Sequence, residues 1–159
     1  MLKRKRGEAA PASPAESSRS GAAEVNYLEL SFAKVPIFSA CSTAELMRVA
    51  SSCTLFDARP GEAVVTEGEI GFDFYVILKG DAVVTRGGAE VGRLTAGDFF
   101  GELALFDPAP RNATITAVGE LSLAVLSKPA FREVLQDAPV RENVFLGMAR
   151  RLHDLDAST

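Results

Sequence analysis

Histidine and cysteine, two residue types that build catalytic and metal sites, are scarce in this chain of 159 residues. There is one histidine, His153, near the C-terminus, and there are two cysteines, Cys41 and Cys53. A His-rich metal site is therefore excluded, and a Ser–His–Asp triad would need the terminal histidine. Two cysteines are too few for a disulfide scaffold, so we interpret them as packed thiols of a cytoplasmic protein. The sequence thus predicts neither catalytic residues nor a metal.

Long hydrophobic runs and an excess of positive charge are also lacking. No run of about 18 apolar residues exists, so we expect no membrane-spanning helix. The net charge is −4 at pH 7, which argues against direct nucleic-acid binding by the body of the protein. The length allows one domain, or one domain with a tail.

Residues 1–24 differ in composition from the rest of the chain. The basic run Lys3–Arg6 is followed by a stretch rich in Ala, Ser and Pro that contains no Val, Ile, Phe or Tyr. Such a segment buries little apolar surface, so we expect a disordered, solvated tail, and no apolar segment follows the basic start as in a secretory signal. Contact of the basic run with nucleic acid, anionic lipid or an acidic partner is the alternative. Residues 25–159 then form the folded domain.

The periodicity of the body predicts strands flanked by helices. Helical spacing over 25–33 predicts a first helix, and Ser42 with Glu45 forms a capping box for a second that runs to about Ser51. About eight short strands separated by turn signals follow, which is typical of a β-sandwich or barrel. Seven of the expected strand segments can be bounded, and they are 54–56, 63–66, 72–78, 82–86, 90–94, 113–117 and 121–125.

The last part of the body predicts two helices. Ser127 and Asp137 are the expected N-caps, each followed by a proline in the opening turn. In the final helix an apolar stripe recurs at every fourth residue, and Phe145 and Ala149 widen it. The members of the stripe are Val140, Val144, Met148 and Leu152.

The segment Phe99–Thr114 carries the chemistry. Pro108 and Pro110 leave room for a single helical turn, from Gly101 to about Phe106. The start of a helical turn exposes backbone N–H groups, which suit an anion, and glycine lets the backbone approach a ligand closely.

Two charged side chains complete this segment. Arg111 can form a forked contact with phosphate oxygens, and Glu102 can accept a hydrogen bond from a hydroxyl. An anion site and a hydroxyl acceptor in one loop describe a ribose phosphate. A surface ion pair between the two residues is the alternative interpretation of these side chains.

In this segment the chain resembles the cyclic nucleotide-binding domains, a family that includes the regulatory subunits of cAMP-dependent protein kinase, the catabolite activator protein and nucleotide-gated channels. The resemblance covers about residues 27–155 and is centred on Phe100–Leu105 and Pro110–Thr114. It implies an eight-stranded, jelly-roll-like β-roll with N-terminal helices, a one-turn phosphate-cassette helix and two C-terminal helices. Supporting motifs are Pro60–Glu62, Glu67–Gly68, Phe74–Gly80 and Ala96–Glu102.

The resemblance also implies roles for individual residues. Arg111 pairs with the negative charge of the cyclic phosphate, and Glu102 takes the ribose 2′-hydroxyl. The rest of the ligand-binding cassette is formed by Gly101, Leu103, Ala104, Asn112 and Ala113. The base is covered by an apolar face of the last helix, for which the candidates are Phe145, Met148, Ala149 and Leu152.

These residues predict a non-catalytic sensor that binds cAMP and signals to an unidentified effector protein by movement of its C-terminal helices. Asn112 departs from the Ala, Ser or Thr that commonly follows the arginine in the family, so selectivity for cGMP stays an alternative. A fragment or relative of a cAMP-responsive transcription regulator or channel is a further alternative. An enzyme of the cupin type would need several histidines on barrel strands, which this sequence lacks.

Overall fold

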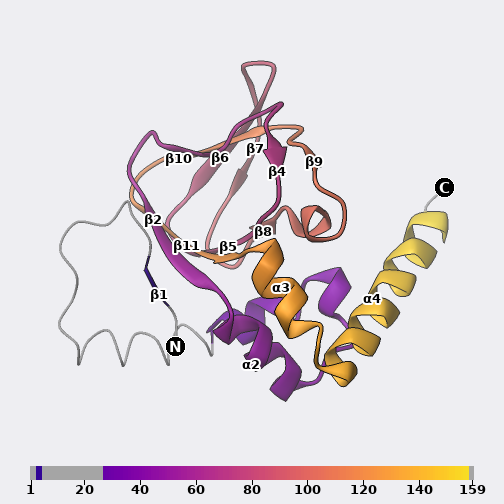
Figure 1. The fold of residues 1–159 in the computed structure, drawn as a ribbon. Helices are drawn as coiled ribbons and strands as arrows, with labels where there is room; N and C mark the ends of the chain where they lie inside the picture. The colour runs from indigo at the N-terminus through magenta and orange to yellow at the C-terminus, as the bar shows by residue number, and fades with distance from the viewer. Residues whose placement is uncertain (1–2, 5–26, 158–159) are drawn as a thin grey trace.

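Two sheets, antiparallel apart from one short parallel pairing, face each other in the upper part of the molecule (Figure 1). The computed structural model describes residues 3–4 and 27–157. One sheet has the order β1-β2-β11-β5-β8, the other β3-β10-β6-β7, and β4 pairs with β9. The first sheet contains β1 (Lys3–Arg4), β2 (Thr54–Ala58), β11 (Leu121–Leu126), β5 (Phe74–Lys79) and β8 (Phe99–Phe100). The others are β3 (Ala63–Val65), β10 (Thr114–Ala117), β6 (Ala82–Arg86), β7 (Ala89–Leu94), β4 (Ile70–Gly71) and β9 (Ala109–Pro110).

The space between the sheets is filled by side chains that alternate along the strands. Ile115 and Ala117 on β10 face Leu121 and Leu123 on β11, and all four are buried. Alternation of this kind places every second side chain in the core. The predicted strand faces of β10 and β11 are therefore confirmed.

Aromatic side chains join the helices to the roll. Phe32 packs edge-on against Phe38 with ring centroids 5.4 Å apart, and Phe74 on β5 lies 5.6 Å from Phe32. Phe131 contacts Phe38 from the C-terminal side at 6.3 Å. Each such pair contributes about 0.5–1.5 kcal/mol beyond area burial. The segments before and after the roll thus share one core.

The helices begin where the sequence predicts. Ser42 and Glu45 form both hydrogen bonds of the capping box that starts α2 (Thr43–Ser51). The Ser127 side chain accepts a hydrogen bond from the N–H of Ala130 and so caps α3 (Lys128–Val134). Asp137 does the same for α4 (Ala138–Ala157) through the N–H of Val140. Residues 27–32 are also helical, and a short 3₁₀ helix, η1 (Pro36–Phe38), follows them.

The fold class, mainly β with flanking helices, is confirmed, but the strand segments differ in detail. The structure has shorter and more numerous strands than the eight expected, because β1, β4, β8 and β9 contain two residues each. Phe72, expected in a strand with Phe74, lies in the two-residue connection between β4 and β5 and is exposed. The expected strand therefore starts at Phe74 and not at Phe72.

Most of the predicted tail lies outside the described residues. Lys3 and Arg4 are the exception, and they form β1, which pairs in parallel with Thr54 and Leu55 of β2. Within the described part of the chain, no helix has both the length and the apolar character required to cross a bilayer.

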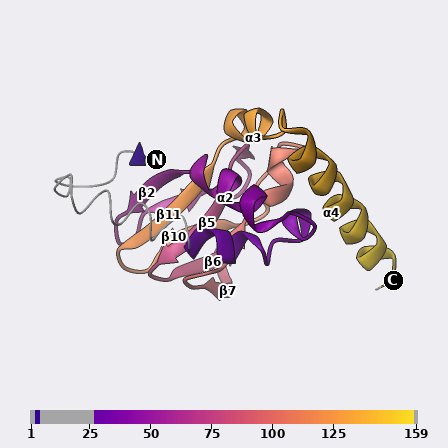
Figure 2. The same ribbon diagram turned by 90° about the horizontal axis from the view of Figure 1, so that it is seen from below.

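The helix α4 leaves the body of the molecule. Figures 1 and 2 both show it running outward past the helices, beyond the strands of the roll. Its N-terminal part is anchored, because Val140 and Val144 are buried in the helical core. Gly147 lies against η1 so closely that a Cβ there would be 2.5 Å from the carbonyl oxygen of Ile37.

Candidate functional site

A short 3₁₀ helix, η2 (Glu102–Leu105), forms the predicted single turn. It follows Gly101, whose φ of 87° lies in the left-handed region that favours glycine. A Cβ on Gly101 would also lie 2.6 Å from Nη1 of Arg111 and 2.8 Å from the Asp73 carbonyl oxygen. Both the conformation and the space therefore require glycine at this position.

The backbone of Arg111 is fixed by the neighbouring loop. Its N–H donates to the Glu69 carbonyl at 2.8 Å, and its own carbonyl accepts from the N–H of Gly68 at 2.8 Å. The pairing of β9 with β4 precedes these bonds, with Ile70 opposite Pro110. The Glu67–Gly68 turn and the proline-bounded loop are thus held together just before the arginine.

The side chain of Arg111 is partly buried and oriented by two neighbours. Its Nη2 donates to the Asp73 carbonyl oxygen at 2.8 Å, and its Cζ lies 5.8 Å from the centre of the Tyr75 ring. Burial is the main cause that raises the pKa of Tyr75, the Asp73 carboxylate adds to it, and the Arg111 charge opposes it. Arginine carries five N–H donors, so the bond to Asp73 leaves donors for an anion.

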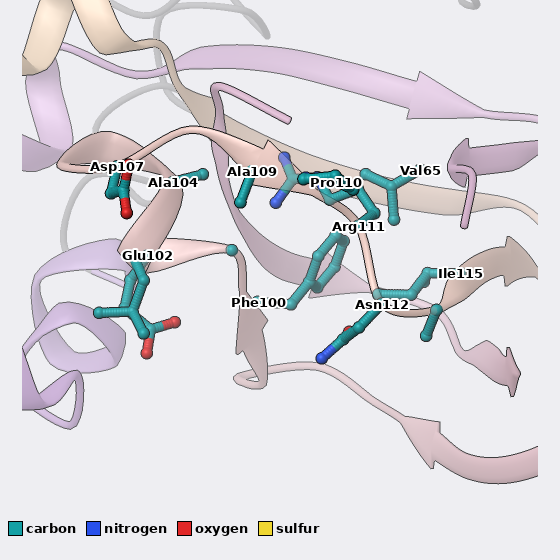
Figure 3. A pocket seen from close by; sticks show the side chains of 13 residues that line it. Val65, Phe100, Glu102, Ala104, Asp107, Ala109, Pro110, Arg111, Asn112 and Ile115 are labelled. Atoms are coloured by element: carbon teal, nitrogen blue, oxygen red, sulfur yellow. The ribbon is translucent and has the colours of Figure 1, made fainter. Parts of the chain in front are cut away.

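A cavity of about 260 Å³ lies between η2, the loop to Arg111 and the first residues of β10. Figure 3 shows the Glu102 carboxylate and the Asn112 amide directed into the same open region. All seven residues predicted for the ligand-binding cassette line this cavity. They are Gly101, Glu102, Leu103, Ala104, Arg111, Asn112 and Ala113.

The four predicted base-covering residues lie elsewhere. Over the part of the chain that the structure describes, none of them is among the residues that line the cavity. Phe145 and Leu152 are 61% and 58% exposed, while Met148 packs against the helical core. Ala149, the fourth, is half-buried on α4. The reason is that α4 uses its N-terminal apolar face against η1 and the neighbouring helices, which directs the rest of the helix away from the roll.

The comparisons with known proteins agree with this geometry. Residues 55–138, more than half of the chain, match the model of the cyclic nucleotide-binding domain family. The chain belongs to this family. The matched model describes a nucleotide-binding domain and not a catalytic one, so the non-catalytic prediction for this domain is confirmed by the match. The match spans β2 to the start of α4 and includes the whole cavity lining.

This cyclic nucleotide-binding domain is similar in sequence to fungal regulatory subunits of cAMP-dependent protein kinase. The subunit of Mycosarcoma maydis is 43% identical over 64% of this chain and 21% of its own length. That of Hypocrea atroviridis is 32% identical over 82% of this chain and 28% of its own length. The domain therefore spans less than a third of the length of these curated relatives.

Solved structures of similar domains have the same fold. The N-terminal domain of a transcriptional regulator from Streptomyces coelicolor is 27% identical, with a TM-score of 0.74 over 84% of this chain and 96% of that domain. The regulatory domain of Toxoplasma gondii PKA, crystallised with cAMP, is 27% identical, with a TM-score of 0.62 over 83% of this chain and 52% of that one.

Six residues that line the cavity were not predicted as site residues. They are Val65, Phe100, Asp107, Ala109, Pro110 and Ile115. Phe100, Asp107, Ala109 and Pro110 lie beside or between predicted cassette residues in the sequence, so their place in the chain could have identified them. Val65 and Ile115 are paired across β3 and β10, 50 positions apart. No local pattern reveals such a pairing, because it depends on the register of the sheet.

Proposed function

We propose that this cyclic nucleotide-binding domain binds cAMP in the cavity and transmits binding through its C-terminal helices. Arg111 pairs with the cyclic phosphate, and Glu102 accepts a hydrogen bond from the ribose 2′-hydroxyl. The observation that carries the proposal is the convergence of all seven cassette residues on one cavity, with a partly buried arginine in its wall. A charge-assisted, forked contact of arginine with phosphate is strong and geometrically specific.

The choice of cAMP is supported by the similar proteins. The two fungal relatives are named as subunits of cAMP-dependent protein kinase, and the Toxoplasma domain was crystallised with cAMP. Asn112 lines the cavity, and its amide both donates and accepts hydrogen bonds. This amide can form hydrogen bonds with either purine base, so cGMP is the competing ligand to be measured.

Titration calorimetry of the full chain with cAMP, cGMP and 5′-AMP tests this assignment. We expect binding of one equivalent of cAMP, weaker binding of cGMP, and the weakest binding of 5′-AMP, which lacks the ring phosphodiester. Binding of cGMP in preference to cAMP would favour the alternative ligand. Absence of heat with both cyclic nucleotides would contradict the proposal.

The size of the cavity supports a role for a moving helix. Its volume of about 260 Å³ is below the range of roughly 300–1,000 Å³ that is usual for sites that enclose small molecules. Such a space accommodates a sugar phosphate and leaves the base side open. The exposed apolar residues of α4, Phe145 and Leu152, then supply a cover when the helix moves toward the roll. A ligand that binds more tightly to the conformation with α4 against the roll shifts the population of molecules toward that conformation.

Two polar contacts, here called the α2–α4 latch, oppose this movement. Arg48 on α2 forms an ion pair with Asp137 at the start of α4. The Asn143 amide donates to Glu45 Oε1 at 2.9 Å. The pKa of Glu45 is lowered mainly by the hydrogen bond from the Ser42 backbone, and the Asn143 bond contributes to the lowering. The stability that these hydrogen bonds to Glu45 provide is present at neutral pH, and it is lost as the pH falls through the lowered pKa of Glu45.

Removing the latch is expected to strengthen cAMP binding. The double variant Arg48→Ala/Asn143→Ala keeps Asp137 and Glu45, which cap α4 and α2. Polar pairs near the surface contribute about 0.2–1 kcal/mol each, so removal of both is expected to increase the affinity by roughly two- to thirtyfold in titration calorimetry. Arg93→Ala, which removes the exposed Arg93–Glu90 pair of β7, is the matched control and should change nothing. Unchanged or weaker binding by the double variant would show that the latch does not hold α4.

For the whole protein, we propose that residues 25–159 act as one regulatory domain in the cytoplasm and signal to a separate effector protein. The kinase and transcription-regulator relatives support regulation as the role, and the matched region supports the domain. The C-terminal helices are the proposed route, since they join the cassette side of the roll to the N-terminal helices.

A further inference from the structure

The Arg111 side chain lies in a narrow slot with four walls. Its Nη2 bonds to the Asp73 carbonyl, and its Nη1 faces Gly101. On a third side is Gly71, where an added Cβ would overlap Nε and Cζ of the arginine. The fourth is the ring of Tyr75, at 5.8 Å from Cζ. Protein groups thus confine the Arg111 guanidinium on four sides.

Tyr75 is itself fixed by an aromatic partner. Its ring stacks on Phe100 with centroids 4.9 Å apart and an interplanar angle of 14°. The two residues are opposite each other in the pairing of β5 with β8. Phe100 directly precedes Gly101 and lines the cavity, and Figure 3 shows its ring on the same wall as Arg111. The stack therefore links strand β5 to the start of the cassette.

Gly71 forms another wall of the slot around the Arg111 side chain. It lies in β4 and pairs with Ala109 of β9, two residues before Arg111. Its φ is not in the left-handed region, so backbone conformation does not require glycine here. The space taken by Arg111 is the reason for glycine at this position.

We propose that Tyr75 and Gly71 are positioning residues of the phosphate site, which hold the Arg111 guanidinium in its binding orientation. This inference rests on the proposed function, since it assumes a phosphate at Arg111. Tyr75 acts through the face of its ring, which attracts a guanidinium. Gly71 acts by lacking a Cβ. A long side chain that is ordered in advance loses less entropy when it binds, so the slot increases affinity without touching the ligand.

Replacement of Tyr75 tests the ring. Tyr75→Leu is expected to weaken cAMP binding about tenfold, the magnitude of a partly desolvated cation–π contact. Tyr75→Phe keeps the ring and should bind within about twofold of the parent. Tyr27→Leu, at the chain's other tyrosine, is the matched control and should have no effect. Full affinity in folded Tyr75→Leu, or equal losses with Phe and Leu, would overturn the role of the ring.

A double-mutant cycle separates positioning from general stability. If Tyr75 acts through the arginine, Tyr75→Leu should cause little further loss when Arg111→Ala is already present. The affinities are measured by displacement of a fluorescent cAMP analogue, and thermal melting checks that each variant is folded. A second loss of about tenfold in the Arg111→Ala background would contradict the inference, because it would show an effect independent of the arginine.

Gly71→Ala tests the wall of the slot that Gly71 forms. The new methyl group must displace the arginine, so we expect a loss of at least tenfold in cAMP affinity. Gly92→Ala is the matched control, since nothing lies within 4 Å of a Cβ there. Equal affinities of the two variants would overturn the role of Gly71. Failure of the parent protein to bind cAMP would instead contradict the proposed function, so the two failures are distinguishable.

Discussion

Arg111→Ala is expected to weaken cAMP binding about a hundredfold, corresponding to a loss on the order of 2–4 kcal/mol. The substitution removes the positive charge and the forked donors from the cavity wall. It also leaves the phosphate with no opposite charge to offset the cost of leaving water. Arg111→Glu, which reverses the charge, should abolish measurable binding. Titration calorimetry gives the affinities.

The loss must be shown to come from the site and not from the fold. Arg111 bonds to the Asp73 carbonyl, so its removal also costs one protein hydrogen bond. Thermal melting should show a modest change, corresponding to about 0.5–1.5 kcal/mol, far less than the binding effect. Arg93→Ala, with an exposed arginine on β7, should bind cAMP as the parent does. Unchanged affinity in folded Arg111→Ala would overturn the assignment of the phosphate site.

Glu102→Gln is expected to weaken cAMP about tenfold and to affect 2′-deoxy-cAMP far less. A hydrogen bond to a charged acceptor contributes about 1.5–3 kcal/mol, and only cAMP offers the 2′-hydroxyl. Glutamine has nearly the shape of glutamate but a weaker acceptor, so the cavity is preserved. Calorimetry with both ligands on both proteins gives the difference directly.

Arg111→Ala serves as the control for this comparison. Both ligands carry the same cyclic phosphate, so loss of the arginine should weaken them by the same factor. The ratio of the two affinities then changes with Glu102→Gln and stays constant with Arg111→Ala. Equal losses of cAMP and its 2′-deoxy analogue in Glu102→Gln would mean that Glu102 supports the cassette and does not contact the ribose.

Features that depend on neighbours in sequence were predictable. The caps at Ser42 and Ser127 follow from hydrogen bonds that span three residues. The tight hairpin between β6 and β7 follows from the Gly87–Gly88 pair, because glycine readily adopts the positive φ values, 59° and 83°, that such a turn needs. The composition of the cassette belongs to the same class, because Glu102 and Arg111 lie in one continuous segment between β8 and β10.

Features that depend on distant parts of the chain were not predictable. Phe72 has the spacing of a strand residue, yet it lies in the connection between β4, which pairs with β9, and β5. The slot around Arg111 combines β4, β5 and β8 with the cassette, which no local pattern joins. The direction of α4 depends on its contact with η1 through Gly147, and this determines that Phe145 and Leu152 are exposed.

Hydrogen exchange with and without saturating cAMP tests the central claim most directly, because it locates binding along the chain. We expect amides of 101–106 and 111–113 to gain protection, and those of 140–155 to gain protection as α4 covers the base. The edge strand β7, none of whose residues line the cavity, should be unchanged. Cassette amides that exchange equally fast with and without cAMP would contradict the account.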